Sequence, residues 1–333
     1  MPRRNSPAPP RIPSPADTST LPSPASRKGS RRGRESDETR CGYVALIGAP
    51  NAGKSTLLNQ LVGQKLAIVT PKVQTTRSRL LGIAMIGPAQ LILVDTPGIF
   101  APRRRLDRAM VAAAWAGAAD ADEVVLLVDA ARPAEPDTLG IIDRLRASGR
   151  DAILALNKID LVRRDHLLGI ADTLFRGGGF DRVFMISSLT GDGVDDLKQH
   201  LASLAPPGPW LFPEDQLSDA HERWLAAEVT REQIFLQLHD ELPYAAAVET
   251  ESWDERGDGS VRIDQVIYVR RDGQKAIVLG EKGQRIKAIG ARARAELEAM
   301  LERRVHLFLF VKVRDNWIED PERYAALGLD YNV

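Results

Sequence analysis

The sequence has little of three features that would each place the protein in a special class. Its 333 residues include one cysteine, Cys41, so no intramolecular disulfide can form, and we expect a reducing compartment and a packing role for this side chain. Basic and acidic residues number 45 each, so no global field attracts nucleic acid. Asp120, Asp122 and Glu123 interrupt the most alanine-rich stretch, so no apolar run approaches the roughly 20 residues that span a bilayer. We therefore expect a soluble globular protein with no transmembrane segment.

The first 38 residues have almost no large apolar side chains and are rich in proline, serine and arginine. Such a segment cannot bury enough surface to offset the entropy lost on ordering, so the composition predicts a disordered tail over residues 1–38. The prolines oppose the amphipathic helix of a transit peptide, and the apolar core of a secretory signal is absent. The arginine- and serine-rich start leaves organelle import open as an alternative.

From residue 43 onward, short apolar runs alternate with longer helical patterns. This alternation predicts an α/β domain with a doubly wound, mostly parallel sheet. The expected strands are residues 43–47, 91–95, 124–129, 153–157 and 183–186. The expected helices, with apolar residues near every third or fourth position, are residues 55–61, 106–118, 138–147 and 194–204. We expect the helices to cover both faces of the sheet.

The alternation ends in a proline-rich stretch, residues 205–213, which predicts a stiff linker. We therefore expect a first domain over residues 40–205, a linker over residues 206–213 and a second domain over residues 214–333. Within the second domain the patterns favour a helix at 218–240, strands at 245–253 and 261–269 around a turn at 257–259, a long helix at 284–304 and a strand at 306–314. These elements make a small α+β module.

A glycine-rich loop follows the first expected strand and opens the first expected helix, which is the context that the phosphate-binding pattern Gly-x4-Gly-Lys-Ser requires. In such a loop backbone N–H groups and the helix N-terminus bind phosphate oxygens. We expect Lys54 to neutralise the β- and γ-phosphates and the Ser55 hydroxyl to ligate Mg²⁺. The loop consists of Gly48, Ala49, Pro50, Asn51, Ala52, Gly53, Lys54, Ser55 and Thr56.

A second motif, Asp95, Thr96, Pro97 and Gly98, closes the next expected strand of the sheet. Its carboxylate then emerges beside the phosphates and can hold Mg²⁺ directly or through water, while the N–H of Gly98 can meet a γ-phosphate. On its own the tetrapeptide reads as an ordinary Pro-Gly turn. Next to the phosphate-binding loop, the metal role is favoured.

The identity of the nucleotide base is predicted from a third motif, again at the end of an apolar strand. It consists of Asn157, Lys158, Ile159 and Asp160. A carboxylate at Asp160 can accept from both N1–H and the 2-amino group of guanine, a donor pair that adenine lacks. We expect Lys158 to lie along the base and Asn157 to tie this loop to the phosphate-binding loop. The segment after the last strand can offer backbone N–H groups to guanine O6; it consists of Ser187, Ser188 and Leu189. The expected ligand is GTP or GDP.

In order and separation these motifs resemble the translation-factor-related class of GTPases over residues 42–205. That class places its first switch near Thr75 and Thr76, so the resemblance gives Thr76 the role of closing on Mg²⁺ and the γ-phosphate, with Thr75 as the alternative. Ras-like switches carry a water-orienting glutamine where this chain has Ile99, so we expect slow intrinsic turnover unless a cation or a partner assists. Related GTPases use an asparagine like Asn51 to hold K⁺, which makes K⁺ activation a hypothesis.

A Gly-x-x-Gly turn precedes the long helix of the second domain. Such a turn beside basic side chains is how a KH domain grips single-stranded RNA. Residues 275–314 hold ten Lys or Arg against four Asp or Glu, although a solvated charged face would also explain this excess. By local pattern residues 276–279 read as a strand, whereas a KH domain makes them a short helix, and we follow the KH reading. The candidate RNA-binding residues are Gly280, Glu281, Lys282, Gly283, Arg285 and Lys287.

Taken together, residues 40–333 resemble the Era family of GTPases. The resemblance is carried by Asn51, residues 74–77, 280–283, 286–290 and 311–317; the N-terminal tail and Ser188, where alanine is usual, depart from it. It implies a type II KH domain and a GTP-hydrolysing switch that binds the single-stranded 3′ end of 16S-type small-subunit rRNA and assists 30S assembly. It further implies a cytoplasmic protein with peripheral contact to the inner membrane, and monomer is the default state.

Two other functions remain open at this point. One is a GTP-gated RNA-binding adaptor with little hydrolysis. The other is another ribosome- or tRNA-related GTPase, against which the single GTPase domain and the absence of a terminal cysteine motif argue.

Overall fold

The computed structural model describes residues 38–72, 75–239, 242–315 and 321–333. Residues Glu38–Val333 form one compact unit. The expected tail, apart from residue 38, lies outside the described residues, as do residues 74 and 316–317 of the segments that resemble the Era family. Within the described part of the chain, no helix is both long and apolar enough to cross a membrane.

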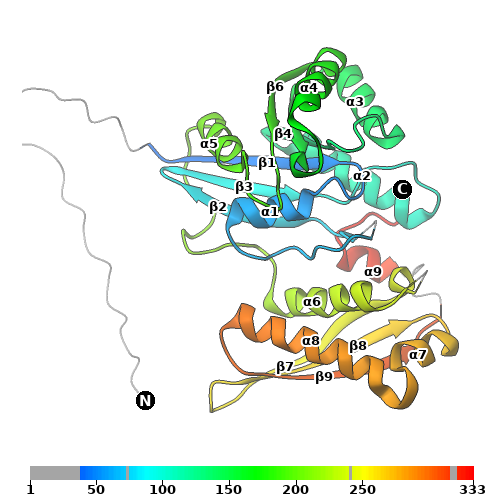
Figure 1. The fold of residues 1–333 in the computed structure, drawn as a ribbon. Coiled ribbons are helices and arrows are strands. Elements are labelled where there is room, and N and C mark those ends of the chain that lie inside the picture. Colours follow the sequence, from blue (N-terminus) through cyan, green and yellow to red (C-terminus); the bar gives the residue numbers. More distant parts are fainter. Residues whose placement is uncertain (1–37, 73–74, 240–241, 316–320) are drawn as a thin grey trace, which may run out of the picture. The chain divides into compact units, whose positions relative to one another are not determined.

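The first sheet has six strands within the described residues, in the order β2-β3-β1-β4-β5-β6 (Figure 1). Their bounds are Arg40–Gly48 (β1), Leu80–Ile86 (β2), Ala89–Asp95 (β3), Glu123–Asp129 (β4), Ala152–Asn157 (β5) and Phe180–Met185 (β6). Neighbouring strands are parallel except β2 and β3, which are antiparallel. The prediction of a doubly wound, mostly parallel sheet is confirmed.

Helices cover both faces of this sheet. Lys54–Val62 (α1) and Val194–Leu204 (α5) pack on one face, and Arg105–Asp120 (α2), Pro136–Ser148 (α3) and Arg164–Gly178 (α4) pack on the other (Figure 1). The carboxyl ends of β1, β3 and β5 lie along one edge of the sheet. In an open α/β sheet this edge is where ligands bind.

Strand β2 and helix α4 have no clear signal in the sequence. Gly82 interrupts the apolar run of β2, yet a Cβ at this position would lie 2.7 Å from Leu58 Cδ1, so the close packing of α1 favours glycine. Helix α4 contains three glycines, which lower helix propensity. It is held instead by burial of one face through Leu167, Ala171 and Leu174.

Residues 205–213 contain no helix or strand but lie against the start of β1. Pro207 forms an isolated bridge with Arg40, and the N–H of Cys41 donates to the carbonyl of Pro206 at 3.1 Å. The N–H of Gly208 donates to the carbonyl of Thr39 at 2.9 Å. This proline-rich stretch is therefore fixed to the first domain by backbone hydrogen bonds.

The second domain has the element order αββααβ that the KH resemblance implies. Its elements are Glu222–Gln237 (α6), Ala247–Glu255 (β7), Val261–Val269 (β8), Asp272–Leu279 (α7), Gln284–Leu301 (α8) and Val305–Val313 (β9). The sheet order is β7-β8-β9, with β7 antiparallel and β9 parallel to β8. Apolar residues of α6 and α8 fill the core beneath it.

The local strand reading of residues 276–279 is wrong, because these residues form the second half of α7. Only Val278 of this helix is fully buried, so four adjacent apolar residues gave no helical period to detect. After β9 the chain continues to helix Pro321–Ala326 (α9). Tyr324 and Leu329 in this last segment pack against Ala109 and Met110 of α2.

Candidate nucleotide-binding site and RNA-binding surface

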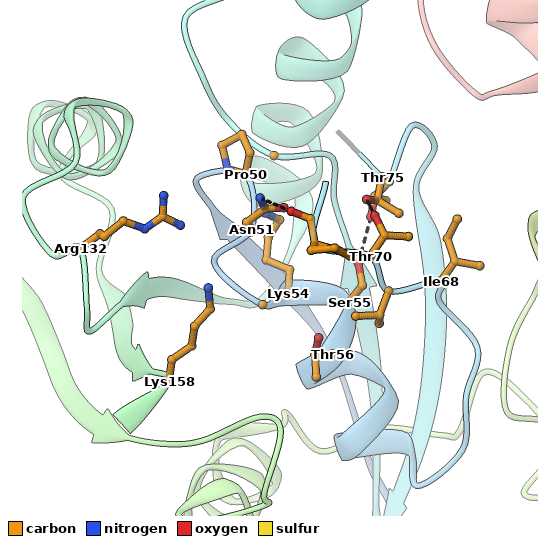
Figure 2. Close-up of a pocket in the computed structure, with 15 residues that line it drawn as sticks. Pro50, Asn51, Lys54, Ser55, Thr56, Ile68, Thr70, Thr75, Arg132 and Lys158 are labelled. Atoms are coloured by element: carbon orange, nitrogen blue, oxygen red, sulfur yellow. Dashed lines mark hydrogen bonds between the residues drawn. The ribbon is translucent and has the colours of Figure 1, made fainter. Parts of the chain in front are cut away.

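A pocket of about 390 Å³ lies where the phosphate-binding loop, the segment around Thr75 and Thr76, and the end of β5 meet. Figure 2 shows Lys158 and Arg132 on one side of this pocket and Ile68, Thr70 and Thr75 on the other. The phosphate-binding loop contributes Pro50, Asn51, Gly53, Lys54, Ser55 and Thr56 to the lining, and Gly98 also lines it. The remaining loop residues, Gly48, Ala49 and Ala52, are buried.

Two glycines of the loop allow contacts that no side chain would permit. Gly48 has φ +154°, and a Cβ there would lie 2.5 Å from the carbonyl oxygen of Leu127. Gly53 has φ +101°, and its Cβ would lie 2.3 Å from Asn157 Nδ2. The loop therefore packs directly on β4 and on the carboxyl end of β5.

Lys54 opens α1 and is almost fully buried at the centre of the loop. Its ammonium group donates to the carbonyls of Gly48 and Ala49 at 3.0 Å each. Burial lowers the pKa of this lysine to about 8, and the nearby carboxylate of Asp95 opposes the shift. A buried cation beside a polar pocket is well placed to attract phosphate.

Ser55, Thr76 and Asp95, the three residues expected to hold Mg²⁺, meet in the structure. The Ser55 hydroxyl donates to Asp95 Oδ2 at 2.7 Å, and the Thr76 hydroxyl lies 2.9 Å from Ser55 Oγ and 3.4 Å from Asp95 Oδ2. Burial raises the pKa of Asp95 to about 6, although hydrogen bonding from Ser55 and the charge of Lys54 act to lower it.

This cluster fits a small divalent cation. Asp95 Oδ1 is buried and has no hydrogen-bond partner among the described residues. One carboxylate and two hydroxyls are the hard oxygen donors that Mg²⁺ prefers, and a cation beside Asp95 would offset the cost of burying its charge.

The structure separates the two switch threonines. The Thr75 hydroxyl donates to the carbonyl of Lys72 at 2.9 Å and lies 2.8 Å from the Thr70 hydroxyl, so it turns back into its own loop (Figure 2). The Thr76 hydroxyl alone reaches Ser55 and Asp95. This geometry favours Thr76 over Thr75 for the metal role.

The segment after Asp95 is fixed by packing. The Thr96 hydroxyl donates to the carbonyl of Leu46 at 2.8 Å, and Pro97 is buried. A Cβ on Gly98 would lie 3.0 Å from Pro50, so this glycine lets the two loops touch. The Ile99 side chain is buried in the core on the α2 face of the sheet. It therefore faces away from the pocket and cannot orient water.

Asn51 has φ +61°, and its amide donates to the carbonyl of Pro71 at 3.1 Å. It thus bridges the phosphate-binding loop to the segment that leads to Thr76. The side chain lies at the pocket, as the K⁺ hypothesis requires, and the hypothesis stays a prediction.

Asn157 ties three loops together. Its Nδ2 donates to the carbonyl of Ala52 at 2.8 Å, and its Oδ1 accepts from the N–H and the hydroxyl of Ser188 at 2.9 and 3.0 Å. The Ser188 hydroxyl therefore adds one hydrogen bond to this junction. The Asn157 side chain is only 1% exposed, so these bonds form in a protected environment.

Asp160 and Lys158 are each held by one partner. Asp160 Oδ1 accepts from the Ser187 hydroxyl at 2.6 Å, and Lys158, with φ +63°, donates to Asp129 Oδ2 at 2.7 Å. Ile159 packs partly on the core, while Leu189 is 78% exposed. These contacts orient the side chains of the expected guanine loop.

Asp129 and Arg132 belong to this site but carry no motif in the sequence. Burial acts to raise the pKa of Asp129, yet the hydrogen bond and charge of Lys158, with help from Arg132, hold that pKa below its ordinary value. Arg132 also pairs with Glu135 and lines the pocket (Figure 2). One signal in the sequence points to Asp129: it ends β4, which lies between β1 and β5, and the ends of both of these strands carry nucleotide-binding motifs.

The expected RNA-binding turn lies between α7 and α8. Gly280 and Gly283 have φ +70° and +76°, and a Cβ on Gly280 would lie 2.6 Å from Arg285 Cβ, so both glycines are required by the backbone. Lys282 and Lys287 are exposed. The Arg285 guanidinium donates to the carbonyl of Ile277 at 3.0 Å.

A groove of about 490 Å³ borders this turn and the end of α6. Arg285 and Arg292 supply positive charge to it, and Glu281 supplies one negative charge. The local balance favours a polyanion. The residues that line this groove are Leu236, Gln237, Gly280, Glu281, Gln284, Arg285 and Arg292.

Comparisons with known proteins identify both domains. Residues 43–158 match a family model described as 50S ribosome-binding GTPase, and residues 241–318 match one described as KH domain. The chain is 57% identical over 297 residues to GTPase Era of Brucella suis, covering 89% of this chain and 96% of the relative. It is 58% identical over 294 residues to GTPase Era of Bradyrhizobium sp. strain BTAi1, covering 88% and 96%.

Solved structures also match across both domains, including two of Era. One is a single-residue variant of Aquifex aeolicus Era bound to GDP and AlF₄⁻, with a TM-score of 0.82 and 36% identity over 87% of this chain and 99% of that one. The other is Era in complex with MgGDPNP and nucleotides 1506–1542 of 16S ribosomal RNA, with a TM-score of 0.82, 37% identity and the same coverage.

Proposed function

Because the chain belongs to the Era family of GTPases and is a GTP-hydrolysing enzyme, we propose that it is a GTP-controlled switch whose KH domain binds the 3′ end of 16S-type rRNA and assists 30S assembly. One observation carries the proposal. Ser55, Thr76 and Asp95 meet beside a phosphate-binding loop in the same chain that holds a Gly-x-x-Gly turn over a basic groove.

For the nucleotide, we propose that the N–H groups of residues 48–56 hold the phosphates and that Lys54 neutralises their charge. Ser55, Thr76 and Asp95 would hold Mg²⁺, which when bound neutralises charge on the β- and γ-phosphates. The N–H of Gly98 would donate to the γ-phosphate. The Asp160 carboxylate would select guanine, and Asn157 would couple the base loop to the phosphate loop.

For hydrolysis, we propose that a group other than residue 99 orients the attacking water. Because Ile99 is buried in the core, the attacking water must be oriented by another group. We propose K⁺ held at Asn51 for part of this task. Phosphate release should then be faster in K⁺ than in Na⁺ buffer, and Asn51→Ala should remove the difference; equal rates for the unaltered protein would dismiss K⁺ activation.

The same assay separates a switch from an adaptor. A GTPase switch releases phosphate in repeated turnovers with Mg²⁺, K⁺ and RNA present. An adaptor that uses GTP only to fix its shape would bind GTP and release no phosphate under any of these conditions.

For RNA, we propose that Gly280 and Gly283 bring the backbone close to phosphate and that Lys282, Arg285 and Lys287 supply charge. Replacing Lys282 and Arg285 by alanine should weaken binding of single-stranded RNA and lower the salt slope by about 2. The matched control replaces Arg164 and Lys198 of the first domain, which makes the same change in charge away from the groove. Equal affinities of both double variants for RNA would remove this surface from the proposal.

On family membership we also propose the domain limits 40–205 and 214–333, action as a monomer on the 30S subunit, and a cytoplasmic location with peripheral contact to the inner membrane. Co-sedimentation of the protein with 30S subunits in the presence of a GTP analogue tests the proposed binding to the 30S subunit. Flotation with vesicles of inner-membrane lipid composition tests the proposed membrane contact, and failure of the protein to float would remove it.

A further inference from the structure

The segment that carries Thr76 is held by the second domain. We call residues 65–72 and 75–77 the switch segment. At its start the Lys65 ammonium pairs with Glu232 of α6 at 2.5 Å, and Glu232 also accepts from the N–H of Val69 at 2.7 Å. Further along, Lys72 donates to the carbonyl of Leu238, just after α6. Helix α6 thus contacts the segment at successive points.

The two residues that flank Thr76 are both fixed to the second domain. Before it, Arg231 Nη2 donates to the carbonyl of Thr75 at 2.6 Å. After it, the Arg77 guanidinium donates to the carbonyls of Pro243, Tyr244 and Ala246 at 3.0 to 3.3 Å. Thr76 itself has its side chain in the other direction, toward Ser55 and Asp95.

Arg231 is a buried residue of α6, unlike a typical surface arginine. It is only 4% exposed, and its guanidinium carbon lies 5.4 Å from the centre of the fully buried Phe235 ring. Arg77 lies over the same ring at 5.8 Å. The buried Phe235 ring therefore makes cation–π contacts with both arginines: Arg231, which binds the carbonyl of Thr75, and Arg77, which follows Thr76.

A purely structural role would be the pairing of Arg231 with Glu228, one turn earlier on α6. Arg231 donates Nε to Glu228 at 2.7 Å, and Nη2 also reaches this carboxylate. That pair would hold the helix without any contact to the switch segment. The additional bond from Nη2 to Thr75 joins the two domains, and Thr75 directly precedes Thr76, which contacts Ser55 and Asp95.

We infer that Arg231 is a positioning residue for GTP hydrolysis. It fixes the carbonyl of Thr75, and this orients the following Thr76 hydroxyl toward Ser55 and Asp95. The inference rests on the proposed role of Thr76 at the nucleotide. It places a determinant of GTP turnover on a helix of the RNA-binding domain.

The test measures GTP turnover against Mg²⁺ concentration for Arg231→Ala and Arg231→Lys. A displacement of catalytic groups by about 1 Å can cost about 100-fold in rate, so a smaller shift of Thr76 in Arg231→Ala should lower kcat about tenfold. It should also raise the Mg²⁺ concentration needed for half-maximal rate. GDP affinity should not change, because GDP has no γ-phosphate for Thr76 to meet. Arg231→Lys keeps the charge but not the fork of donors, so its rate should fall in between.

Arg303→Ala is the control for lost packing and charge in the second domain, since Arg303 pairs with Glu255 and makes a cation–π contact with Trp253. It should leave the Mg²⁺ dependence unchanged. Thermal melting of each variant shows whether the fold persists. If Arg231→Ala does not fold, Arg231→Lys carries the test.

A double-mutant cycle with Thr76→Ala decides whether Arg231 acts through Thr76. The inference predicts that Arg231→Ala lowers kcat no further once Thr76 is alanine. If the two losses in kcat multiply, or if Arg231→Ala weakens GDP and GTP binding equally with normal Mg²⁺ dependence, Arg231 is structural and the inference is overturned. If Thr76→Ala alone retains full turnover, the proposed role of Thr76 fails and this inference fails with it.

Discussion

The Gly53→Ala variant would test the junction between the phosphate-binding loop and the guanine loop. Gly53 has φ +101°, and a Cβ there would lie 2.3 Å from Asn157 Nδ2, far inside contact distance. The Asn157 amide must move, which breaks its 2.8 Å hydrogen bond to the carbonyl of Ala52. Both loops of the nucleotide site are then released from each other.

The expected loss of nucleotide affinity in Gly53→Ala follows from this one contact. Losing the Asn157 hydrogen bond and leaving a buried polar group unpaired costs about 2 kcal/mol. If nucleotide binding requires the intact junction, restoring it at this cost makes binding of GDP and GTP roughly 30-fold weaker. The positive φ adds about 1–2 kcal/mol of backbone strain, which lowers the stability of the whole fold.

Gly63→Ala separates the two effects. Gly63 closes the other end of α1 with φ +84°, and a Cβ there meets nothing within 4 Å. This control should therefore lower the melting temperature without changing nucleotide affinity. Titration with a fluorescent GDP analogue, together with thermal melting, measures both quantities. If Gly53→Ala binds GDP as tightly as Gly63→Ala does, the Asn157 junction does not support the nucleotide site.

Three further predictions concern single groups of the site. A protonated Asp95 cannot ligate a cation, so with a pKa of about 6 the affinity for Mg²⁺ should fall about tenfold per unit below pH 6; affinity held down to pH 4 would contradict this. Ile99→Gln should destabilise the fold by about 2–3 kcal/mol in denaturant titration without raising turnover, because the side chain enters the core; faster hydrolysis would refute that placement. Asp160→Asn should lower GTP affinity at least about tenfold and leave the fold intact, as competition binding and circular dichroism would show.

The sequence predicted the parts of the site in which the chemistry is local. The motifs around Lys54, Asp95 and Asn157 each follow an apolar strand, so parallel pairing alone brings them to one edge of the sheet. Periodicity likewise predicted the long helices and the three strands of the second domain. Helix α7 was assigned correctly only through the KH resemblance, because its short apolar run carries no helical period.

Other features depend on tertiary packing and had no local signal. The choice between Thr75 and Thr76 rests on which hydroxyl the loop turns toward Asp95. Arg231 sits in a helix rich in charged residues, and a charged helix face normally indicates exposure to water. Its burial, and with it the contact to Thr75, becomes apparent only when the two domains are placed together.

In the proposed switch, GTP binding controls the affinity of the KH domain for RNA. The most direct measurement is the affinity for single-stranded RNA from the 3′ end of 16S rRNA, with a non-hydrolysable GTP analogue and with GDP in the same salt. We predict binding about tenfold tighter with the GTP analogue, in the usual range of coupling between two sites, and loss of most of that binding when Lys282 and Arg285 are alanine. Equal RNA affinity in the two nucleotide states would contradict the account.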